Sequence, residues 1–451
     1  MTLMAQPYQH LHFIKFKDLT KWYVSYYLNP YSIKSSFSLV RLKETITPAQ
    51  EKIRLNDYDG ETKVVKKISF ADGKIHLREE NKTKMDLYKL RLNDLLVSKI
   101  NFHQGAISIN KIEDLVCSTH YQPYKIDNSK VLSEYLVLVL RSETFLRFID
   151  FLRAEGIKNE ATYEFIGNLE IPLPTLKKQK EFVSSYYKQI QFAEQQRTEV
   201  EKLEQEIEAT ICKQLGIKLK KINSKKGINV FSYHEITKWS VDFIFKQSGL
   251  SGLRKSLYPL VPLGEIITYL QYGISEKSNV EYKGTVVLRM NNIQNRKIDL
   301  TDLKHCNFEV SKLNKSRVLL EKGDLLFNRT NSKELVGKTA VFDLDGEYTF
   351  ASYLIRLRFT KDVNPYYVNY ILNSQIGRIQ IDLFSRQILG QANINSQEIR
   401  DILLPFPSLE IQNKLVDDLD KIVAEQNRLS LKSKGNRIEA LQQFEHDVYN
   451  L

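Results

Sequence analysis

Residues 171–179 read Ile-Pro-Leu-Pro-Thr-Leu-Lys-Lys-Gln, and residues 404–412 read Leu-Pro-Phe-Pro-Ser-Leu-Glu-Ile-Gln. Both stretches follow one pattern: an apolar residue, then Pro-x-Pro-x-Leu, then a glutamine three positions after the leucine. The first proline ends an extended segment, and the second presets φ for the helix that follows. Because the pattern recurs 233 residues later in a chain of 451, it predicts an internal duplication in which each half ends in a long helix.

Further matched segments extend the duplication over most of the chain. They share residue identity at equivalent places and include Thr20-Lys21-Trp22 with Thr237-Lys238-Trp239, Asp94-Leu95-Leu96 with Asp324-Leu325-Leu326, Tyr135 with Tyr367, and Ser142 with Ser374. The separation between partners grows from 217 to 233 residues along the chain. Small insertions in two diverged copies produce such a steady drift, whereas chance matches would scatter.

The composition is that of a soluble globular protein with a basic surface. Sixty-six Lys and Arg against 54 Asp and Glu give a net charge of +12. A surplus of cations favours a polyanionic partner, because each phosphate contact releases condensed counterions. A basic surface with no such partner remains an equally open interpretation.

Cysteine usage and the apolar runs indicate a cytoplasmic protein. Cys117, Cys212 and Cys306 are too few and too scattered for a disulfide framework or a metal cage, and fit buried free thiols in a reducing compartment. The segment from Met1 to Lys17 lacks the apolar stretch of a signal peptide. No run approaches the ~20 apolar residues that span a bilayer.

Each half combines two kinds of sequence pattern, which together predict an α+β fold class. Short alternating segments and turn signals predict a strand-rich domain that also holds helices, at Ser133–Ala154 in the first half and Pro365–Ile381 in the second. Apolar residues at steps of three and four then predict a long helix. The predicted order is a domain at 1–173, a helix at 174–217, a basic linker at 218–231, a domain at 232–406 and a helix at 407–451.

The two long helices have apolar stripes typical of coiled-coil packing. We expect them to pack on each other, with packing of each helix on its own domain as the alternative. Gly435-Asn436 interrupts the second stripe, and a bend or break is expected there.

Motifs for catalysis are missing from the sequence. Asn364-Pro365-Tyr366-Tyr367 is similar to the tetrad of amino-methyltransferases, but it lacks the second proline, and no Gly-rich turn for an adenosyl cofactor precedes it. Pro365 instead suits the first position of a helix. No phosphate loop, paired-cysteine metal motif or convincing nuclease set occurs, so the sequence predicts a binding protein without catalytic residues.

Two kinds of polar cluster are candidates for contact with a nucleic acid. One follows each Asp-Leu-Leu segment, and the other lies at residues 289–297, with a weaker match at residues 66–69. Arg pairs with guanine and Asn or Gln with adenine in the major groove, although a polar hairpin in water would look the same. The candidate DNA-binding residues carry cationic, amide or imidazole groups: Lys66, Lys67, Lys99, Asn101, His103, Gln104, Arg289, Asn291, Asn292, Asn328, Arg329, Asn331, Lys333 and Lys338.

The whole pattern resembles the specificity subunit of type I restriction-modification systems. The resemblance rests on the order domain, helix, domain, helix, on the two Pro-x-Pro entries, on residues 323–329 with Val336-Gly337-Lys338, and on residues 390–394. The first half departs from it, with Asn93 in place of Gly323 and no clear equivalent of Gly390.

The resemblance implies two target-recognition domains that each read one part of a bipartite double-stranded DNA site. It implies an antiparallel coiled coil with a pseudo-twofold repeat, which spaces the domains and docks two adenine-methyltransferase subunits. Those subunits would bring S-adenosylmethionine, and restriction subunits, if present, would bring ATP and Mg in a phage-defence system. The chain itself would bind no cofactor or metal. A specificity module of another modification system, a stand-alone DNA-binding repressor and, less favoured, a coiled-coil scaffold remain alternatives.

Overall fold

The computed structural model describes residues 33–153, 161–219, 230, 244, 250–281, 284–307, 315–333, 335–388 and 391–449. The matched tryptophan segments at 20–22 and 237–239, Gly390 and most of the predicted linker at 218–231 lie outside the described residues. The chain divides into two compact units, one formed by residues 1–196 and 431–451 and the other by residues 197–430.

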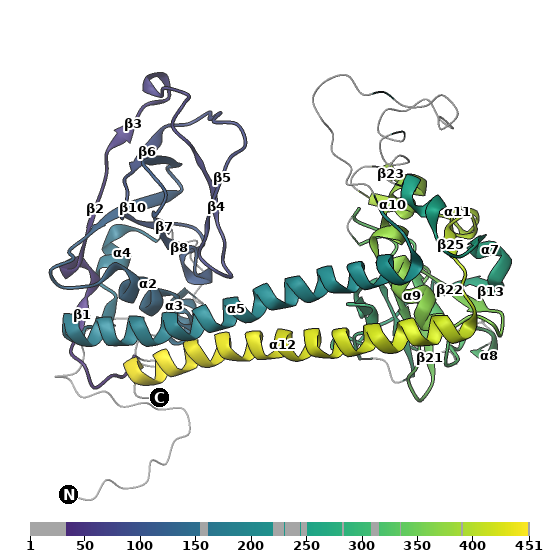
Figure 1. Cartoon of the computed structure of the whole chain (residues 1–451). Coiled ribbons are helices and arrows are strands. Elements are labelled where there is room, and N and C mark those ends of the chain that lie inside the picture. Colours follow the sequence, from purple (N-terminus) through teal and green to yellow (C-terminus); the bar gives the residue numbers. More distant parts are fainter. Residues whose placement is uncertain are drawn as a thin grey trace, which may run out of the picture. The chain divides into compact units, whose positions relative to one another are not determined.

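Helices α5 (Leu176–Leu215) and α12 (Leu409–Tyr449) are each a single continuous element (Figure 1). The first unit contains the start of α5 and the end of α12, whereas the second contains the end of α5 and the start of α12. Both helices are therefore shared between the units. The compact units divide each helix near its middle, so they do not test the domain boundaries predicted from the sequence. Those boundaries remain a prediction.

The strands of the first unit form four antiparallel sheets. In sheet order they are β2 (Ile46–Pro48), β10 (Tyr121–Ile126), β7 (Leu95–Ser98) and β8 (Ile107–Ile109); β3 (Lys52–Ile53), β6 (Leu87–Leu90) and β9 (Leu115–Ser118); β4 (Val65–Ile68) with β5 (Ile75–Leu77); and β1 (Leu39–Arg41) with β11 (Glu170–Pro172). The helical segments are η2 (Leu42–Glu44), η3 (Leu55–Asp57), η4 (Phe102–Gln104), α2 (Ser133–Arg141), α3 (Glu143–Arg153) and α4 (Tyr163–Gly167).

The second unit repeats this core and adds further strands. Its sheets, in strand order, are β13 (Ile267–Tyr272), β22 (Leu354–Phe359), β18 (Leu325–Asn328) and β20 (Thr339–Val341); β17 (Lys304–Cys306), β14 (Thr285–Leu288) and β21 (Tyr348–Phe350); β19 (Thr330–Asn331), β24 (Gln391–Asn393) and β23 (Arg386–Ile388); β15 (Ile293–Gln294) with β16 (Lys297–Ile298); and β12 (Leu260–Pro262) with β25 (Leu403–Pro405). The helical segments are η6 (Leu250–Lys255), α7 (Leu263–Ile266), η7 (Met290–Asn292), α8 (Lys315–Val318), α9 (Pro365–Asn373), α10 (Gln375–Phe384) and α11 (Ser396–Arg400).

The predicted duplication is visible in the topology. The sheet order β2-β10-β7-β8 of the first unit matches β13-β22-β18-β20 of the second, and the pair β1-β11 matches β12-β25. In both units the Asp-Leu-Leu segment forms a central, fully buried strand.

The glutamine of the repeated motif is buried and joins the long helix to the domain in the same way in both copies. The side chain of Gln179 accepts the Leu132 N–H at 2.8 Å and donates to the carbonyls of Lys130 and Pro174. Gln412 likewise accepts the Asn364 N–H at 2.9 Å and donates to Asp362 and Pro407. These bonds satisfy backbone groups that burial would otherwise leave unpaired, which gives the motif a structural reason.

The helices predicted at Ser133–Ala154 and Pro365–Ile381 are each two helices in the structure. α2 ends before Ser142 and α3 follows it, while α9 ends before Ser374 and α10 follows it. The Ser142 hydroxyl donates to the Val139 carbonyl and accepts the Phe145 N–H, so one side chain ends the first helix and caps the second. The matched serines thus mark a helix break that apolar periodicity alone conceals.

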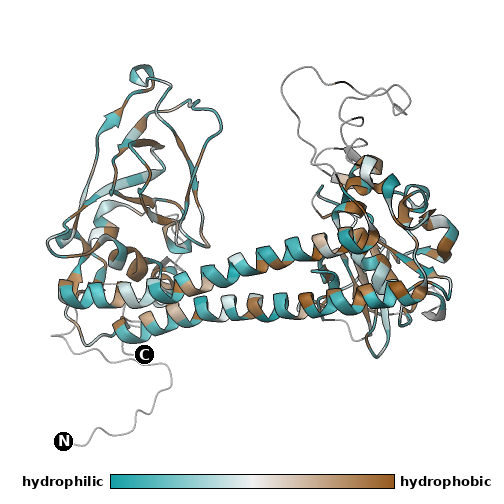
Figure 2. Cartoon of the chain, in the orientation of Figure 1, coloured by the Kyte–Doolittle hydropathy of each residue, from teal (hydrophilic) through white to brown (hydrophobic). Residues whose placement is uncertain are grey.

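The long helices pack on the domains and on each other, so the two expectations are not exclusive. Phe182 of α5 and Phe444 of α12 share the core of the first unit, as Ile207 and Leu419 share that of the second. The Ser433 hydroxyl donates to the Ala193 carbonyl at 2.8 Å, an antiparallel contact between the helices. Figure 2 shows teal and brown residues alternating along both helices, as an amphipathic pattern requires.

The predicted interruption at Gly435-Asn436 does not break the second helix. α12 continues from Leu409 to Tyr449, and the Asn436 side chain donates to Gln196 on α5. This contact compensates for the weak helix preference of the Gly-Asn pair. Among the described residues, no helix combines the length and the apolar character needed to cross a membrane.

Candidate nucleic-acid interface

Arg329 directly follows the central strand β18, and its backbone is held on both sides. The Arg329 N–H donates to the Tyr353 carbonyl at 3.0 Å, and its own carbonyl accepts the Ile394 N–H at 3.0 Å. Its guanidinium carbon lies 5.0 Å from the ring centroid of Tyr272, and a guanidinium N–H donates to the Asn393 side chain at 3.2 Å. A half-buried cation is thus fixed just after the end of β18, an inner strand of the four-stranded sheet.

Lys99 occupies the equivalent position at the end of β7 in the first unit. Its N–H donates to the His120 carbonyl at 2.9 Å, and its carbonyl accepts the Ala161 N–H at 2.7 Å. The Lys99 ammonium nitrogen lies 5.5 Å from the centroid of the Tyr88 ring. Both repeats therefore hold a cation over a tyrosine at the same pinned backbone position, although the two tyrosines come from different strands.

The carboxylate of the Asp-Leu-Leu segment is part of the scaffold. Asp324 accepts the Glu321 N–H at 2.8 Å and forms ion pairs with two arginines of β22, Arg356 at 3.4 Å and Arg358 at 2.5 Å. Its equivalent, Asp94, accepts the Arg91 N–H at 2.9 Å. Burial raises the pKa of Asp94, although the backbone hydrogen bond from Arg91 opposes this effect.

Asn328, another candidate from the sequence, is buried. It is only 1% exposed, and its side chain donates to the Leu335 carbonyl at 3.2 Å, which holds the loop that follows. Its backbone also pairs with Gly337 and Lys338. The Asn328 side chain therefore has a structural role, and its predicted contact with DNA stays a prediction.

The cluster at residues 289–297 is mostly structural as well. Asn292 is 1% exposed; it accepts the Arg289 N–H and donates to the carbonyls of Asp299 and Asp302. The Arg289 guanidinium pairs with the Asp302 carboxylate at 2.7 Å. These contacts use the polar groups of Asn292 and Arg289 to close the loop, and their predicted contact with DNA stays a prediction. Asn291 is exposed and remains a candidate.

The structure brings the two clusters of the second unit together. The Asn331 amide contacts the Met290 sulfur at 3.4 Å, and the Lys338 ammonium lies 3.4 Å from the Gln294 side-chain oxygen. Burial, and secondly the charge of Arg378, lowers the pKa of Lys338. Lys333 is exposed. The loop after β18 and the β15–β16 hairpin therefore form one continuous polar region.

The turn of that hairpin is anchored to a long helix. Asn295 and Arg296 have φ values of 49° and 65°, as a two-residue hairpin turn requires. The Arg296 guanidinium forms an ion pair with Glu204 of α5, and Glu204 also accepts a hydrogen bond from Gln426 of α12 at 2.9 Å. The hairpin is thereby tied to both helices within the second unit.

Arg141 joins the corresponding clusters of the first unit. From the end of α2 it donates to the carbonyls of Phe70, in the β4–β5 turn, and of Gly105, after η4. Gly73 has a φ of +72°, and a Cβ atom there would lie 3.0 Å from the Arg141 guanidinium. Only glycine combines this backbone with so close an approach.

The first-unit candidates on these two segments remain accessible. Lys66 and Lys67 are exposed on β4, where the register shifts after Val65, and Gln104 is exposed. Asn101 and His103 are half-buried. Arg141 thus joins the β4–β5 turn to the η4 loop, although no sequence pattern selects this arginine.

Tyr272, Tyr88, Asn393 and Arg141 are the residues of these sites that sequence reasoning missed. Tyr272, Asn393 and Arg141 reach these sites from elements that are distant along the chain; Asn393 lies 64 positions from Arg329. Tyr88 comes from β6, the strand that precedes β7. The one available signal was the abundance of aromatic residues near cations, which is too common to select a pair.

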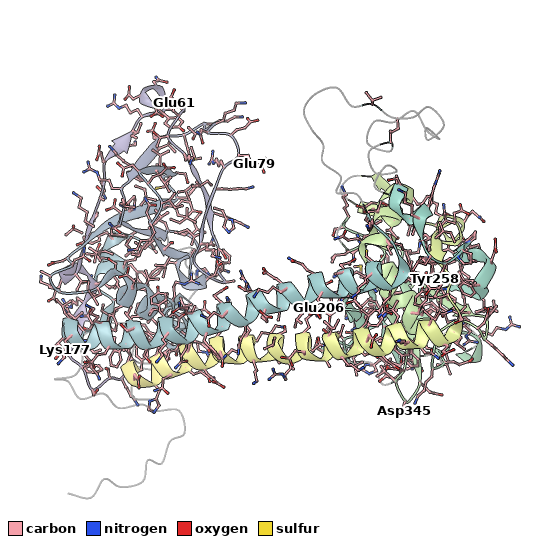
Figure 3. All side chains as sticks on the ribbon, in the orientation of Figure 1. Glu61, Glu79, Lys177, Glu206, Tyr258 and Asp345 are labelled. Carbon is pink, nitrogen blue, oxygen red and sulfur yellow. The ribbon has the colours of Figure 1, made fainter. Side chains whose placement is uncertain are left out.

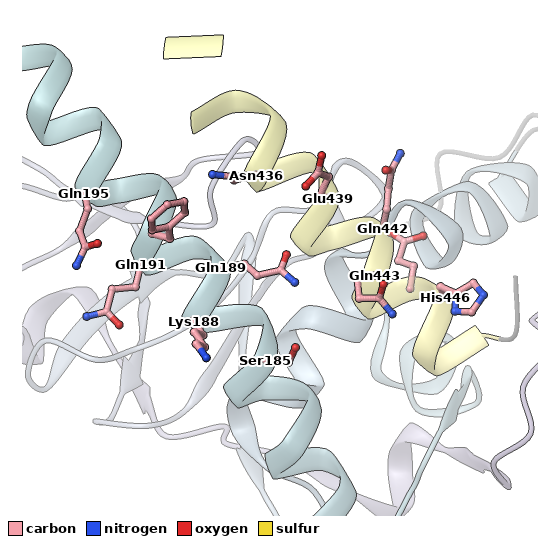
Figure 4. A pocket seen from close by; sticks show the side chains of 12 residues that line it. Ser185, Lys188, Gln189, Gln191, Gln195, Asn436, Glu439, Gln442, Gln443 and His446 are labelled. Carbon is pink, nitrogen blue, oxygen red and sulfur yellow. The ribbon is translucent and has the colours of Figure 1, made fainter. Parts of the chain in front are cut away.

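A groove of about 1180 Å³ lies between α5 and α12 in the first unit, and most of its lining residues are polar. Its lining includes Gln189, Gln443 and His446, labelled in Figure 4, and the side chain of Phe192, which is 55% exposed. Figure 3 shows charged side chains such as Lys177 and Glu206 pointing outward from α5. Among the described residues, no group of three or more His, Cys, Asp or Glu could hold a metal ion.

Comparison with known proteins relates this architecture to DNA specificity proteins. Residues 38–202 and 258–440 match the family described as type I restriction modification DNA specificity domain. The chain is 27% identical over 172 residues to the putative type I restriction enzyme MjaX specificity subunit of Methanocaldococcus jannaschii, which covers 37% of this chain and 40% of that protein. It is also 27% identical over 172 residues to the type I restriction enzyme EcoKI specificity subunit of Escherichia coli K12, which covers 38% and 37%.

The chain thus spans about two fifths of the length of these curated relatives. A solved structure described as "Structural basis underlying complex assembly and conformational transition of the type I R-M system" has a TM-score of 0.52 at 17% identity, and covers 93% of this chain and 98% of that one. This similarity confirms the predicted fold class. The family match extends over both domains and parts of both helices, so the chain belongs to the type I restriction modification DNA specificity domain family.

Proposed function

We propose that the chain is the specificity subunit of a type I restriction-modification complex and that its two α+β domains each read one part of a bipartite double-stranded DNA site. One observation carries the proposal: both domains hold a cation over a tyrosine at the same pinned position, Lys99 in one and Arg329 in the other. A protein that reads two half-sites needs such paired, separately built contact points.

The two domains would read different bases. Arg329 presents a fork that fits two acceptors, whereas Lys99 is a point charge on a flexible stem. Asn291 of the second unit has no amide counterpart among Lys66, Lys67 and Ser69. Exposed Lys66, Lys67, Gln104, Asn291 and Lys333 flank the pinned cations and would contact bases or phosphates.

Bond-making chemistry would come from partner subunits. We propose that two modification subunits dock on α5 and α12 and bring S-adenosylmethionine, and that restriction subunits, where present, bring ATP and Mg. The groove beside Phe192 supports docking on the helices, because residues of both α5 and α12 line it and it contains none of the candidate DNA-binding residues. The chain itself would bind no cofactor, and would act in the cytoplasm.

A domain exchange tests this function. Residues 232–406 are replaced by the corresponding segment of a relative, and the chain is co-expressed with its modification subunits. Mapping of methylated adenines in the host genome should show one half of the target changed and the other retained.

Three results would count against the proposal: no methylation dependent on the wild-type chain, a change in both halves, or methylation that continues at the old site. Sequence-specific DNA binding by the chain, without any partner-dependent methylation, would point to a repressor instead.

A further inference from the structure

We infer that Tyr272 and Asn393 are positioning residues, which together hold the Arg329 guanidinium ready to donate to an acceptor of DNA. The inference rests on the proposed function and extends it to a named contact in the second domain. Neither Tyr272 nor Asn393 is among the candidate residues selected from the sequence.

The guanidinium is oriented from two directions. The Tyr272 ring lies beneath it, with its centroid 5.0 Å from the central carbon, and the Asn393 carbonyl oxygen accepts one N–H at 3.2 Å. The backbone of Arg329 is fixed by its hydrogen bonds to Tyr353 and Ile394. Few torsions of this arginine are therefore left to lose when a ligand binds, and preorganisation of this kind increases affinity.

The two positioning side chains are themselves anchored. The Tyr272 hydroxyl accepts the N–H of Ser396, the first residue of α11, at 3.2 Å. The Asn393 oxygen also accepts the Thr330 hydroxyl at 3.3 Å, across the β19–β24 pair. The tyrosine is thus braced at its tip, and the amide oxygen faces the arginine and the threonine.

Several other half-buried or buried arginines of this unit have an acidic partner. Arg289 pairs with Asp302, Arg296 with Glu204, and Arg356 and Arg358 with Asp324. For Arg329, among the residues that the structure describes, the recorded side-chain partners are an aromatic face and a neutral amide. Among these partners no carboxylate balances its charge. The Nε–H is buried, so the Nη N–H groups that do not donate to Asn393 are the ones that suit acceptors supplied by a ligand.

The acceptor chemistry that fits is a pair of oxygen or nitrogen lone pairs, on the guanine O6/N7 edge or on a phosphate. The first domain shows the same arrangement with a different cation, since Lys99 lies over Tyr88. Two tyrosines recruited from non-equivalent strands to the same position indicate that a braced cation is useful there.

The test compares Tyr272→Leu, Tyr272→Phe, Arg329→Ala and the double variant Tyr272→Leu/Arg329→Ala, each in the full chain assembled with its modification subunits. Tyr269→Leu is the matched control, because Tyr269 is on the same strand and is similarly exposed, at 42% against 40% for Tyr272, but lies over Arg356 and Arg358. Binding is measured on the duplex found by methylation mapping, on single-base-pair variants and at several salt concentrations.

We expect Arg329→Ala to weaken cognate binding by about 5- to 150-fold. Tyr272→Leu should weaken it by about 2- to 30-fold, Tyr272→Phe should retain most of it, and the double variant should be no weaker than Arg329→Ala. Lost discrimination at one base pair would assign a guanine, and a uniform loss with a smaller salt slope would assign a phosphate.

Additive effects of the two substitutions, or Tyr272→Leu binding as tightly as wild type, would overturn the inference. So would an equal loss in Tyr269→Leu, because that would reflect general damage to the strand. If the wild-type complex itself had no preferred sequence, the proposed function would fail, and this result is separate from any variant.

Discussion

Replacing Asp324 by Asn should destabilise the second domain strongly, whereas the equivalent change at Asp94 should not destabilise the first. Asp324 is 1% exposed and balances Arg356 and Arg358, of which Arg356 is only 2% exposed. Asparagine keeps the acceptor for the Glu321 N–H but removes the negative charge. Arg358 would then keep only the exposed carboxylate of Glu321, 2.8 Å away, and Arg356 would keep only neutral oxygen partners.

Removing one member of a buried ion pair costs about 3–5 kcal/mol, because the other charge remains buried without compensation. The isosteric substitution and the partial exposure of Arg358 place the expected loss near the lower limit, at about 3 kcal/mol. Asp94 has no such arginine pair. Its burial raises its pKa, so the ionised form costs stability in the folded state.

The contribution of Asp94 to stability depends on pH because its pKa is raised in the folded state. Its folded pKa lies above the unfolded value, so folding takes up a proton between the two values. Stability therefore falls as pH rises through that window and stays lower above it. Asp94→Asn should remove the loss and be neutral or stabilising at neutral pH.

Hydrogen exchange of the full chain measures both effects at once. Peptides that cover β18 and β22 should lose protection in Asp324→Asn, and peptides that cover β7 and β10 should keep or gain it in Asp94→Asn. A second variant, Asp324→Asn with Arg356→Met, should recover part of the loss, since an apolar replacement of a buried charge is often tolerated. Equal losses in both domains, or a loss below about 1 kcal/mol for Asp324→Asn, would refute the reasoning.

Three further predictions concern the helix contacts. Gln412→Ala should destabilise the second unit by about 2–4 kcal/mol in chemical denaturation, because the Asn364 N–H loses its acceptor in a buried site. Lys178→Ala, on the exposed face of α5, is the control and should have almost no effect. Glu445→Ala should destabilise the first unit by about 1–2 kcal/mol, because Glu445 accepts the Glu143 and Thr144 N–H groups at the start of α3. The measurement is faster hydrogen exchange at the start of α3, with Glu439→Ala, exposed on the same helix, as the control. Equal effects of the two substitutions would contradict the capping role. Inserting four residues after Leu203 together with four after Asn427 should lengthen the non-specific gap of the target by one or two base pairs, because one added turn of both helices is about 6 Å. The assay is methylation of duplexes that differ in gap length. An unchanged gap preference would show that the helices do not set the gap length.

The duplication, the long helices and the motif glutamines could be predicted because their signals are local or periodic. Residues 171–179 and 404–412 repeat in order, and the apolar stripes of α5 and α12 follow helical spacing. The sharing of both helices by both units was not predictable, because it depends on contacts such as Ser142 with Tyr449, 307 positions apart. No pattern within a single segment records such a pairing.

The candidate site residues fall into two groups that differ in burial. Arg329 and Lys99 lie where the repeat placed them, but Asn292 and Asn328 do not face solvent. An amide that binds adenine and an amide that binds a backbone carbonyl use the same donor and acceptor pair, so the residue type cannot separate the two uses. Only burial does, and burial of a loop residue is a property of the folded chain.

The core of the first unit has a consequence for the order in which the protein forms during synthesis. That core contains Phe182 near the start of α5, together with Phe444, Val448 and Tyr449 at the end of α12. At about 5–20 residues per second, a ribosome needs roughly 13–53 seconds to pass from Phe182 to Tyr449. The first domain to emerge must wait with an unfilled apolar surface while the second is made, and it is completed only by the last turn of the last helix. A nascent chain released early would therefore lose the folded state of its beginning as well as its end.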